Sequence, residues 1–221
     1  MTPKIVVFDW GGVILRIVRS FEEGCQRAGL PVHAEAGAQT LRDLRSALAQ
    51  EFQKGTITED EFYAEVAKLT AGKYSAKEFQ LIHDAWLIAE YPGVAQLIHD
   101  IHGAGVATTG LLSNTNHRHW MRHLPRDGTP GDFPTIGLLR HKHASHLMGL
   151  AKPDLAIFRR FEDLSGFQRS DILFFDDLSE NVEAARQIGW HAIQIDHQGD
   201  TASQMRAELL KRQVLPQQPT D

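Results

Sequence analysis

The sequence of 221 residues, with a mass of 24.8 kDa, is long enough for one domain, or one domain with an insert, around a buried core. Its 42% hydrophobic and 23% charged residues are typical of a soluble globular protein, and no apolar run is long enough to cross a membrane. The formal net charge of −5 gives no basis for nucleic-acid binding. The N-terminus lacks the pattern of a secretion signal, and the single cysteine, Cys25, excludes an internal disulfide, so we expect a cytoplasmic protein.

The first predicted element is a short buried strand over residues 4–9, rich in β-branched residues. From Arg16 to Tyr91 the pattern becomes helical instead. Two helices in this stretch begin with predicted capping boxes, at Thr58 and at Ser75, each followed by a glutamate three residues on. The helix before them carries apolar residues at intervals of three and four, namely Leu41, Leu44, Leu48 and Phe52. We therefore predict an all-helical cap, inserted over residues 16–92.

Strands and helices alternate in the rest of the chain. The predicted helices cover residues 94–102, 153–164, 179–188 and 201–212, and the predicted strands cover residues 106–112, 171–175 and 191–195. Residues 118–143 have the least regular pattern, and the prolines between Pro125 and Pro134 indicate a loop. The alternation predicts an α/β fold, a doubly wound parallel sheet, formed by residues 1–15 and 93–214.

A polar cluster follows the first strand. Asp9 ends the strand, and Gly11 and Gly12 allow backbone amides to approach an anion closely. An aspartate in this position can attack phosphorus and form an aspartyl-phosphate, although a strand-end aspartate can also simply cap a turn. Trp10 either shapes a substrate pocket or packs beneath the cap, and we count it among the substrate-binding candidates.

Two adjacent carboxylates, Asp176 and Asp177, follow the strand predicted over residues 171–175. Neighbouring carboxylates repel each other unless a cation lies close by. Mg2+ prefers oxygen ligands and typically takes one or two carboxylates together with a substrate phosphate. The pair therefore favours a metal site over its alternative, an exposed acidic turn.

Three further residues suit the binding of a phosphoryl group. Ser113 offers a hydroxyl at the end of a strand, and the amide of Asn114 can donate to the same phosphate oxygen. Lys152 precedes Pro153, which we expect to start a helix, so its ammonium can hold both the nucleophile and the phosphate. Each of these residues alone would more often be an ordinary surface residue.

These residues lie in four segments of the chain: 6–13, 111–116, 151–154 and 173–181. In this order the segments resemble the four motifs of the haloacid dehalogenase superfamily, whose commonest members are Mg2+-dependent phosphatases. Residues 52–58, 113–116 and 174–181 are closest to sugar-phosphate phosphatases and to the N-terminal phosphatase domain of soluble epoxide hydrolase. The resemblance implies a Rossmannoid core with a cap that selects the substrate.

The resemblance also implies roles for the acidic residues. Asp9 and Asp177 would bind Mg2+ directly, the Gly11 carbonyl would be a third ligand, and Asp176 would act through a water molecule. Most phosphatases of the superfamily have a second aspartate two residues after the nucleophile, as general acid and base, but this chain has Gly11 there. Losing such a group typically costs ~10²–10⁴-fold in rate. Three explanations would each account for the glycine. The leaving group can be a good one that needs little protonation, such as an anomeric sugar oxygen; another group can supply the proton; or the chain can be a binding protein with weak catalysis.

Two other members of the superfamily are alternatives. Asp9-Trp10 followed by a small residue and glycine resembles phosphonoacetaldehyde hydrolase, which forms a Schiff base through a cap lysine. The cap lysines here are Lys54, Lys68, Lys73 and Lys77, and surface solvation is the simpler role for each. The 2-haloacid dehalogenases also lack the second aspartate, but they use no metal and would leave Asp176 and Asp177 without a role.

Six histidines crowd the segment before Lys152. They are His117, His119, His123, His141, His143 and His146. Imidazole suits Zn2+ or Ni2+, yet no cysteine joins these residues and a proline-rich loop divides them. The pattern favours a partly exposed, titratable basic surface near the mouth of the cleft.

Together these features predict a Mg2+-dependent phosphomonoester hydrolase that acts on a small phosphorylated metabolite such as a sugar phosphate. Asp9 is the predicted nucleophile, and Ser113, Asn114 and Lys152 are predicted to hold the phosphoryl oxygens. The alternative is a catalytically weak binding or regulatory protein with the same fold. The particular substrate and the oligomeric state are not readable from the sequence.

Overall fold

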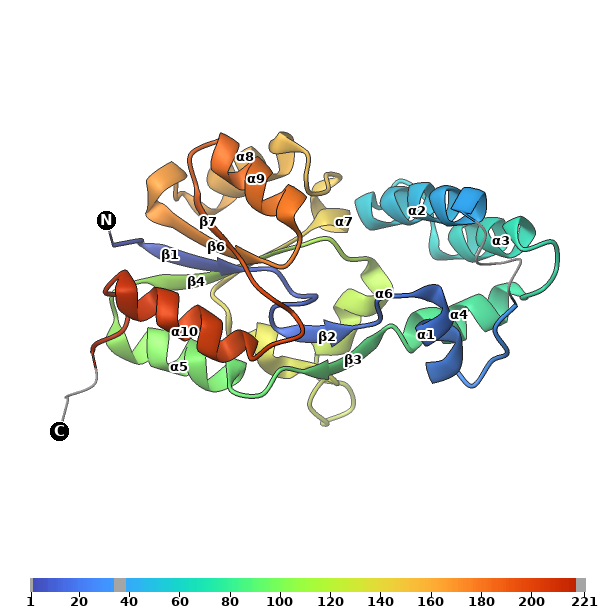
Figure 1. Ribbon diagram of the computed structural model, residues 1–221, viewed down its shortest axis with the longest axis horizontal. Helices are drawn as coiled ribbons and strands as arrows, with labels where there is room; N and C mark the ends of the chain where they lie inside the picture. Colours follow the sequence, from blue (N-terminus) through green and yellow to red (C-terminus); the bar gives the residue numbers. More distant parts are fainter. Residues whose placement is uncertain (1, 34–38, 218–221) are drawn as a thin grey trace.

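The computed structural model describes residues 2–33 and 39–217, and a five-stranded parallel sheet lies at its centre (Figure 1). The sheet consists of β1 (Ile5–Phe8), β4 (Thr108–Ser113), β5 (His141–Ala144), β6 (Ile172–Asp176) and β7 (His191–Gln194). Its strand order is β5-β4-β1-β6-β7, and every neighbouring pair is parallel. Because β1 lies between β4 and β6, the three segments that follow these strands meet at one edge of the sheet.

Helices cover both faces of the sheet, as the predicted doubly wound fold requires (Figure 1). Helices α5 (Val94–Ala104) and α10 (Thr201–Lys211) pack on one face, and α8 (Leu155–Ser165) and α9 (Ser179–Gln187) on the other. Alternate side chains of β1 enter opposite layers, so that Val6 and Phe8 join the first cluster while Ile5 and Val7 join the second.

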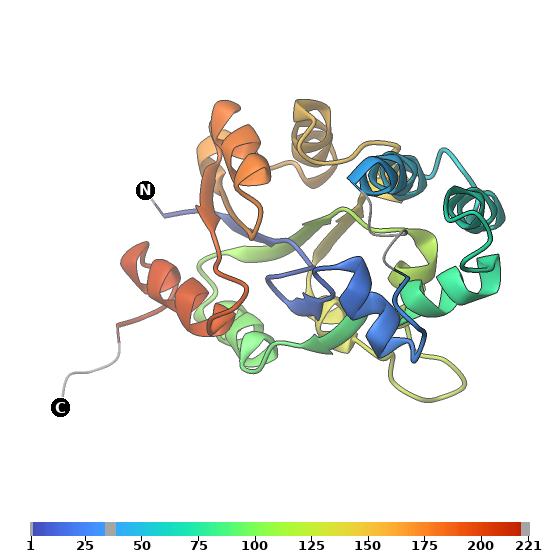
Figure 2. The ribbon, with the colours of Figure 1, turned by 45° about the vertical axis from the view of Figure 1, so that its right-hand side comes forward.

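The cap lies beyond the carboxyl ends of the central strands (Figures 1 and 2). It contains α1 (Phe21–Arg27), α2 (Gln39–Lys54), α3 (Glu59–Leu69) and α4 (Ala76–Asp84). Both predicted capping boxes are confirmed, at Thr58 and at Ser75. The four helices enclose a hydrophobic cluster of their own, formed by Cys25, Phe52, Phe62, Tyr63, Val66, Tyr74, Phe79 and Ile82.

The prediction of an all-helical stretch from Arg16 to Tyr91 is wrong at both ends. Strands β2 (Leu15–Ile17) and β3 (Leu87–Glu90) pair there as an antiparallel ribbon, which connects the cap to the core. Each strand has only three or four residues, too few for a clear twofold pattern of hydrophobicity. Residues 34–38 of the predicted stretch lie outside the described part of the chain.

The irregular segment before Lys152 contains the largest departure from expectation. It forms α6 (His117–Trp120), η2 (Met121–His123), η3 (Pro134–Leu138), the edge strand β5 and α7 (Ser145–Met148). Strand β5 was missed because its sequence is largely polar and it pairs on one side only. Helix α8 begins at Leu155 with Asp154 as its N-cap, two residues later than the start expected from Pro153. The short helix η4 (Arg169–Asp171) then leads into β6. Among the described helices, none has the length and apolar character needed to span a membrane.

Candidate active site

The predicted catalytic residues converge at the carboxyl edge of the sheet. Asp9 follows β1, Ser113 is the last residue of β4, and Asp176 and Asp177 lie at the end of β6. Oxygen atoms of Asp9, Asp176 and Asp177 lie within 4.8 Å of one another, and all three residues are buried. Parallel strand order alone therefore brings together residues that are more than 160 positions apart in the sequence.

Lys152 links two of these carboxylates, those of Asp9 and Asp176. Its Nζ lies 3.0 Å from Asp9 Oδ1 and 2.6 Å from Asp176 Oδ2, and its side chain has no exposed surface. Burial opposes the charge of this ammonium, but Asp176 and Asp9 outweigh that effect and raise the pKa of Lys152. The lysine is therefore a fixed positive charge beside the nucleophile.

The buried carboxylates still exceed their positive partners. Burial raises the pKa of Asp9 to about 7; Lys152 acts against this shift, whereas Asp176 and Asp177 add to it. Burial also raises the pKa of Asp177, with Arg19 acting against it. Excess negative charge carried by oxygen donors fits a hard divalent cation such as Mg2+.

Asp176 differs from its two neighbours in how fully its oxygens are engaged. Besides Lys152, it accepts hydrogen bonds from the backbone N–H of Leu178 at 2.9 Å and from Asn181 Nδ2 at 3.0 Å. Such a carboxylate suits a role behind the metal ligands, where it orients Lys152. Asp9 and Asp177 are the better candidates for direct contact with a cation, and the ligand set expected from the sequence stays a prediction.

Gly12 allows the main chain to pass against Asp177. Its φ is +82°, in the left-handed region, and a Cβ placed there would lie 2.4 Å from Asp177 Cγ. A side chain at this position would displace the carboxylate. The second of the two glycines after Asp9 is therefore required by both backbone conformation and space.

The Asn114 side chain is arranged differently from expectation. Its Nδ2 donates to the Lys152 carbonyl at 2.8 Å, and its Oδ1 accepts from the Lys152 N–H at 2.8 Å. These paired bonds hold the lysine backbone in place rather than aiming the amide at a phosphate. Ser113 is buried beside it, and its predicted contact with the phosphoryl group stays a prediction.

Arg19 is a member of the site that sequence reasoning missed. Its Nη1 lies 2.7 Å from Asp177 Oδ2, and its side chain is one-third exposed. The residue belongs to the segment between β2 and α1, which carries no motif. A contact 158 residues apart along the chain leaves no local signal in the sequence.

Gly11 occupies the position at which the family resemblance leads us to expect a second aspartate in most phosphatases. A Cβ at Gly11 would meet Ile17 Cδ1 at 3.0 Å, so an apolar side chain covers this position. A side chain at this position would therefore have to displace Ile17.

The prediction of a partly exposed basic surface is wrong for two of the six histidines. His119 and His123 are buried. Burial lowers the pKa of His119 to about 4, even though its Nε2 bonds to the His83 carbonyl at 2.8 Å. Among the described residues, the acidic cluster of Asp9, Asp176 and Asp177 is the one group of three side chains that could hold a metal ion.

His83 and His119 join the cap to the loop that follows β4. Their rings stack with centroids 3.9 Å apart, and Asn116 Nδ2 lies 3.3 Å from His83 Nε2. Since Asn116 Oδ1 accepts from the His119 N–H, its Nδ2 donates to His83 Nε2, and His83 Nδ1–H then faces the Tyr63 hydroxyl at 2.7 Å. Arg118 strengthens this boundary with ion pairs to Asp84 and Glu59.

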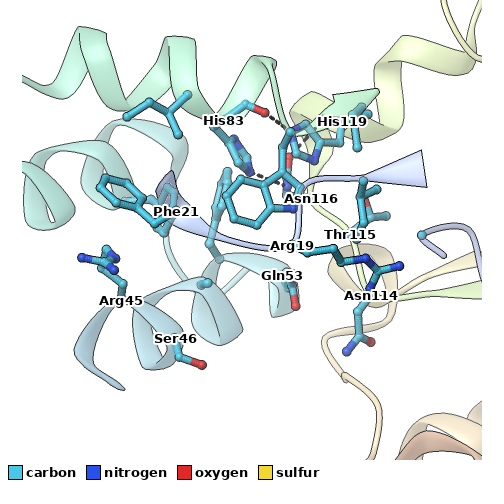
Figure 3. A pocket seen from close by; sticks show the side chains of 18 of the residues that line it. Arg19, Phe21, Arg45, Ser46, Gln53, His83, Asn114, Thr115, Asn116 and His119 are labelled. Atoms are coloured by element: carbon cyan, nitrogen blue, oxygen red, sulfur yellow. Dashed lines mark hydrogen bonds between the residues drawn. The ribbon is translucent and has the colours of Figure 1, made fainter. Parts of the chain in front are cut away.

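A cavity of about 500 Å3 lies between cap and core, next to these residues (Figure 3). Trp10 lines it and also packs edge-on against Trp120 of α6, with ring centroids 6.4 Å apart; its role in substrate binding stays a prediction. The cap lysines do not line this cavity; Lys54 and Lys68 pair instead with Glu51 and Glu65. The described lining therefore offers no amine for a Schiff base.

Comparisons with known proteins identify the family of the chain and several similar proteins. Residues 3–189 match the model of the haloacid dehalogenase-like hydrolases, and the chain belongs to this family. It is 26% identical to D-ribitol-5-phosphate phosphatase of Bacteroides thetaiotaomicron, covering 93% of this chain and 98% of that protein. It is 25% identical to a phosphatase of Mycobacterium tuberculosis, covering 91% of each. It is also 26% identical to acyl-CoA dehydrogenase family member 10 of Mus musculus, but spans only 19% of that protein.

Solved structures show the same fold. A HAD family enzyme of Bacteroides thetaiotaomicron, determined as a magnesium complex, has a TM-score of 0.72 and 21% identity, covering 93% of this chain and 100% of that chain. A predicted HAD-like hydrolase of Porphyromonas gingivalis has a TM-score of 0.74 and 22% identity, covering 95% of this chain and 98% of that chain. A 2-haloacid dehalogenase of Pseudomonas syringae is less similar, with a TM-score of 0.57, 19% identity and coverage of 96% of this chain and 99% of that chain.

Proposed function

We propose that this hydrolase is a Mg2+-dependent phosphatase that cleaves a small phosphomonoester through an aspartyl-phosphate on Asp9. One observation carries the proposal: Lys152 bridges Asp9 and Asp176 within a buried cluster of three carboxylates. A buried cluster of this composition offers a nucleophile, a fixed positive charge and oxygen ligands for a metal. Bound Mg2+ would neutralise charge on the phosphoryl oxygens.

The reaction divides into two displacements at phosphorus. Asp9 attacks, the bond to the leaving oxygen breaks, and the departing alkoxide or phenolate takes a proton from solvent. Water then attacks the phosphorus of the aspartyl-phosphate, which releases hydrogen phosphate, a proton and the Asp9 carboxylate. Lys152 stabilises the phosphoryl charge in both steps, while Asn114 holds the main chain of the lysine.

The second candidate is a binding protein that retains the fold but turns over weakly. Gly11 favours it, because Ile17 covers the position from which a second aspartate would act. A dehalogenase is a weaker candidate, since it would give the buried pair Asp176 and Asp177 no metal to organise.

The proposed activity also suggests the partner, the domain organisation and the location of the protein. The partner is a phosphorylated small molecule rather than nucleic acid, and residues 16–92 act as a cap over a core of residues 1–15 and 93–214. We retain a cytoplasmic location as a prediction, because the single cysteine, Cys25, is a free thiol.

The test is phosphate release from 4-nitrophenyl phosphate, with Mg2+ and with a chelator. We expect release by the wild type in Mg2+ only, and a loss of at least about 10³-fold in Asp9→Asn. The control is Asp163→Asn, which makes the same change at an exposed position of α8 and should retain full activity. Metal-independent release, or equal release by Asp9→Asn, contradicts the phosphatase; binding of phosphate esters without any release supports the second candidate.

A further inference from the structure

Arg19 connects the cap to the acidic cluster through both its main chain and its side chain. It directly precedes Ser20, the N-cap of α1, and its N–H donates to Glu23 Oε2 at 2.9 Å within the first turn of that helix. Its side chain leaves the cap and reaches the core, where Nη1 donates to Asp177 Oδ2 at 2.7 Å. A movement of α1 relative to the core would therefore act on a candidate metal ligand.

Both connections between cap and core meet near this ion pair. Arg19 follows β2 on the way into the cap, and Tyr91 follows β3 on the way back. Burial raises the pKa of Tyr91, and the nearby guanidinium of Arg19 acts against this shift. The Tyr91 hydroxyl donates to the His197 carbonyl at 2.6 Å, which ties the second connection to the core. The pair of Arg19 with Asp177 therefore lies where the cap is joined to the core.

The guanidinium of Arg19 also lies against the main chain of the active site. A Cβ at Gly12 would lie 2.6 Å from Arg19 Nη2. Arg19 is also among the residues that line the cavity between cap and core (Figure 3). The same side chain therefore borders both the candidate metal ligands and the space that a substrate would occupy.

The two cations at the acidic cluster are held differently. Lys152 has no exposed side-chain surface and contacts both Asp9 and Asp176. Among the described residues, the Arg19 guanidinium forms an ion pair with Asp177 alone, and 33% of its side chain is exposed. Water screens a partly exposed pair, whereas a buried pair is costly to break. Arg19 is therefore the cation whose contact a competitor weakens more easily.

Arg19 and a divalent metal would draw on the same negative charge. Mg2+ prefers carboxylate oxygens, and Asp9, Asp176 and Asp177 offer such atoms within 4.8 Å of one another. A second cation at Asp177 would repel the Arg19 guanidinium and share the charge that holds it. Binding of the metal and the contact of Arg19 therefore oppose each other.

We propose that Arg19 is a positioning residue that couples the cap to the metal site by competing with Mg2+ for the Asp177 carboxylate. This inference rests on the proposed function and assigns a regulation to the same site. Arg19 neutralises Asp177 and holds the start of α1 against the core in the metal-free protein. It loosens as Mg2+ binds, so that α1 gains freedom to move. Because such coupling is reciprocal, a cap held by Arg19 also weakens the binding of Mg2+.

The first experiment measures the affinity for Mg2+ by calorimetry, with no substrate present. Arg19→Gln should bind Mg2+ roughly 3- to 30-fold more tightly than the wild type, because it lacks the competing charge. Arg19→Lys should stay close to the wild type, because it keeps that charge. The control is Arg27→Gln, which removes the same charge at an exposed position of α1 and should leave the affinity unchanged.

Hydrogen exchange of the backbone amides tests the coupling to the cap. In the wild type, residues 18–25 should exchange faster with Mg2+ than with a chelator, because the metal loosens the contact of Arg19. In Arg19→Gln the same residues should exchange equally fast in both conditions. Helix α5, on the far side of the core from the cap, is the internal reference and should exchange at the same rate throughout.

The outcomes separate this inference from the proposed function, since neither measurement involves turnover. Weaker or unchanged binding of Mg2+ in Arg19→Gln overturns the inference, as does exchange of residues 18–25 that does not respond to Mg2+ in the wild type. The expected changes without phosphate release from any ester would reject the phosphatase and support the role of Arg19. Phosphate release with equal Mg2+ affinity in wild type and Arg19→Gln would do the reverse, and a wild type that binds no Mg2+ would reject both.

Discussion

The active site in the core and the cavity between cap and core differ in how their polar groups are held. In the core, the side chains of Lys152 and Asp176 are fully buried and form an ion pair. Lys152 also pairs with Asp9, and Asn181 donates a hydrogen bond to Asp176, so the four side chains form one network. In that cavity, Arg45 projects from a helix over the Phe21 ring, and most of the wall is carbon. The core is organised by main-chain topology, whereas the cavity is organised by side-chain packing among α1–α4.

Under the proposed function, this difference separates the groups that catalyse the reaction from those that select the substrate. The catalytic groups follow strand ends, whose positions are set by the hydrogen-bonded register of β4, β1 and β6. The lining of the cavity depends on the packing of short helices, so one substitution can change its size or charge without moving the nucleophile. Variants on each side of the boundary should therefore produce different kinds of failure.

The largest effect is expected for the charge at the centre of the core. Lys152→Gln removes the positive charge between two buried carboxylates, and we expect it to destabilise the metal-free protein by about 3–5 kcal/mol and to abolish most activity. Mg2+ should restore part of the stability, because it neutralises the same carboxylates. Urea unfolding with Mg2+ and with chelator measures both changes.

The control for this variant is Lys77→Gln on the exposed face of the cap, which should leave stability and activity near wild type. Similar stability of Lys152→Gln and Lys77→Gln would mean that the core network is not organised by its lysine.

A smaller loss is expected where the main chain passes the metal site. Gly12→Ala places a side chain at a φ of +82° and into Asp177, and we expect a loss of about 1–3 kcal/mol in stability together with weaker binding of Mg2+. Gly103→Ala, in α5 with open space around it, should instead be neutral or stabilising by up to about 1 kcal/mol. Thermal unfolding measures the stability of the two variants, and calorimetric titration measures their Mg2+ affinity. Equal Mg2+ affinity in Gly12→Ala and wild type would contradict the described site.

The smallest effect is expected at the boundary between core and cap, as a dependence on pH. Burial lowers the pKa of His119 from 6.5 to about 4, so its contribution to stability is complete above pH 6.5 and is lost as the pH falls towards 4. One such group changes the free energy of unfolding by at most about 1.4 kcal/mol per pH unit. Urea midpoints between about pH 7 and about pH 5 should fall less in His119→Asn than in wild type.

His99→Gln, an exposed substitution on α5, is the control and should follow the wild-type pH profile. If the urea midpoint of His119→Asn fell with pH as steeply as that of the wild type, protonation of this histidine would not be what destabilises the protein at low pH.

The sequence predicted the three central strands of the sheet better than the edge strand β5 for a physical reason. Asp9, Ser113 and Asp176 end apolar strands, and parallel strands place such residues together without further information. Strand β5 was missed because His141, Lys142 and His143 give it no apolar pattern. The fold class therefore followed from periodicity, whereas an edge strand defined only by its pairing did not.

Residues that act through tertiary contacts were not predictable. Arg19 reaches Asp177 and His83 stacks on His119 only after the cap has packed, and neither residue belongs to a motif. The role of Asn114 in substrate binding stays a prediction, and its bonds to the main chain of Lys152 depend on a distance that the sequence does not contain. The sequence motifs indicated candidate residues for the site, and the structure showed which residues contact them.

The central claim is that Asp9 becomes covalently phosphorylated. Acid quenching during turnover of an aryl phosphate in Mg2+, followed by borohydride reduction, converts an aspartyl-phosphate to homoserine, which peptide mass spectrometry locates in the chain. We predict homoserine at residue 9, dependent on Mg2+ and on the ester. Sustained phosphate release with unmodified Asp9, or with homoserine at another position, would contradict the account.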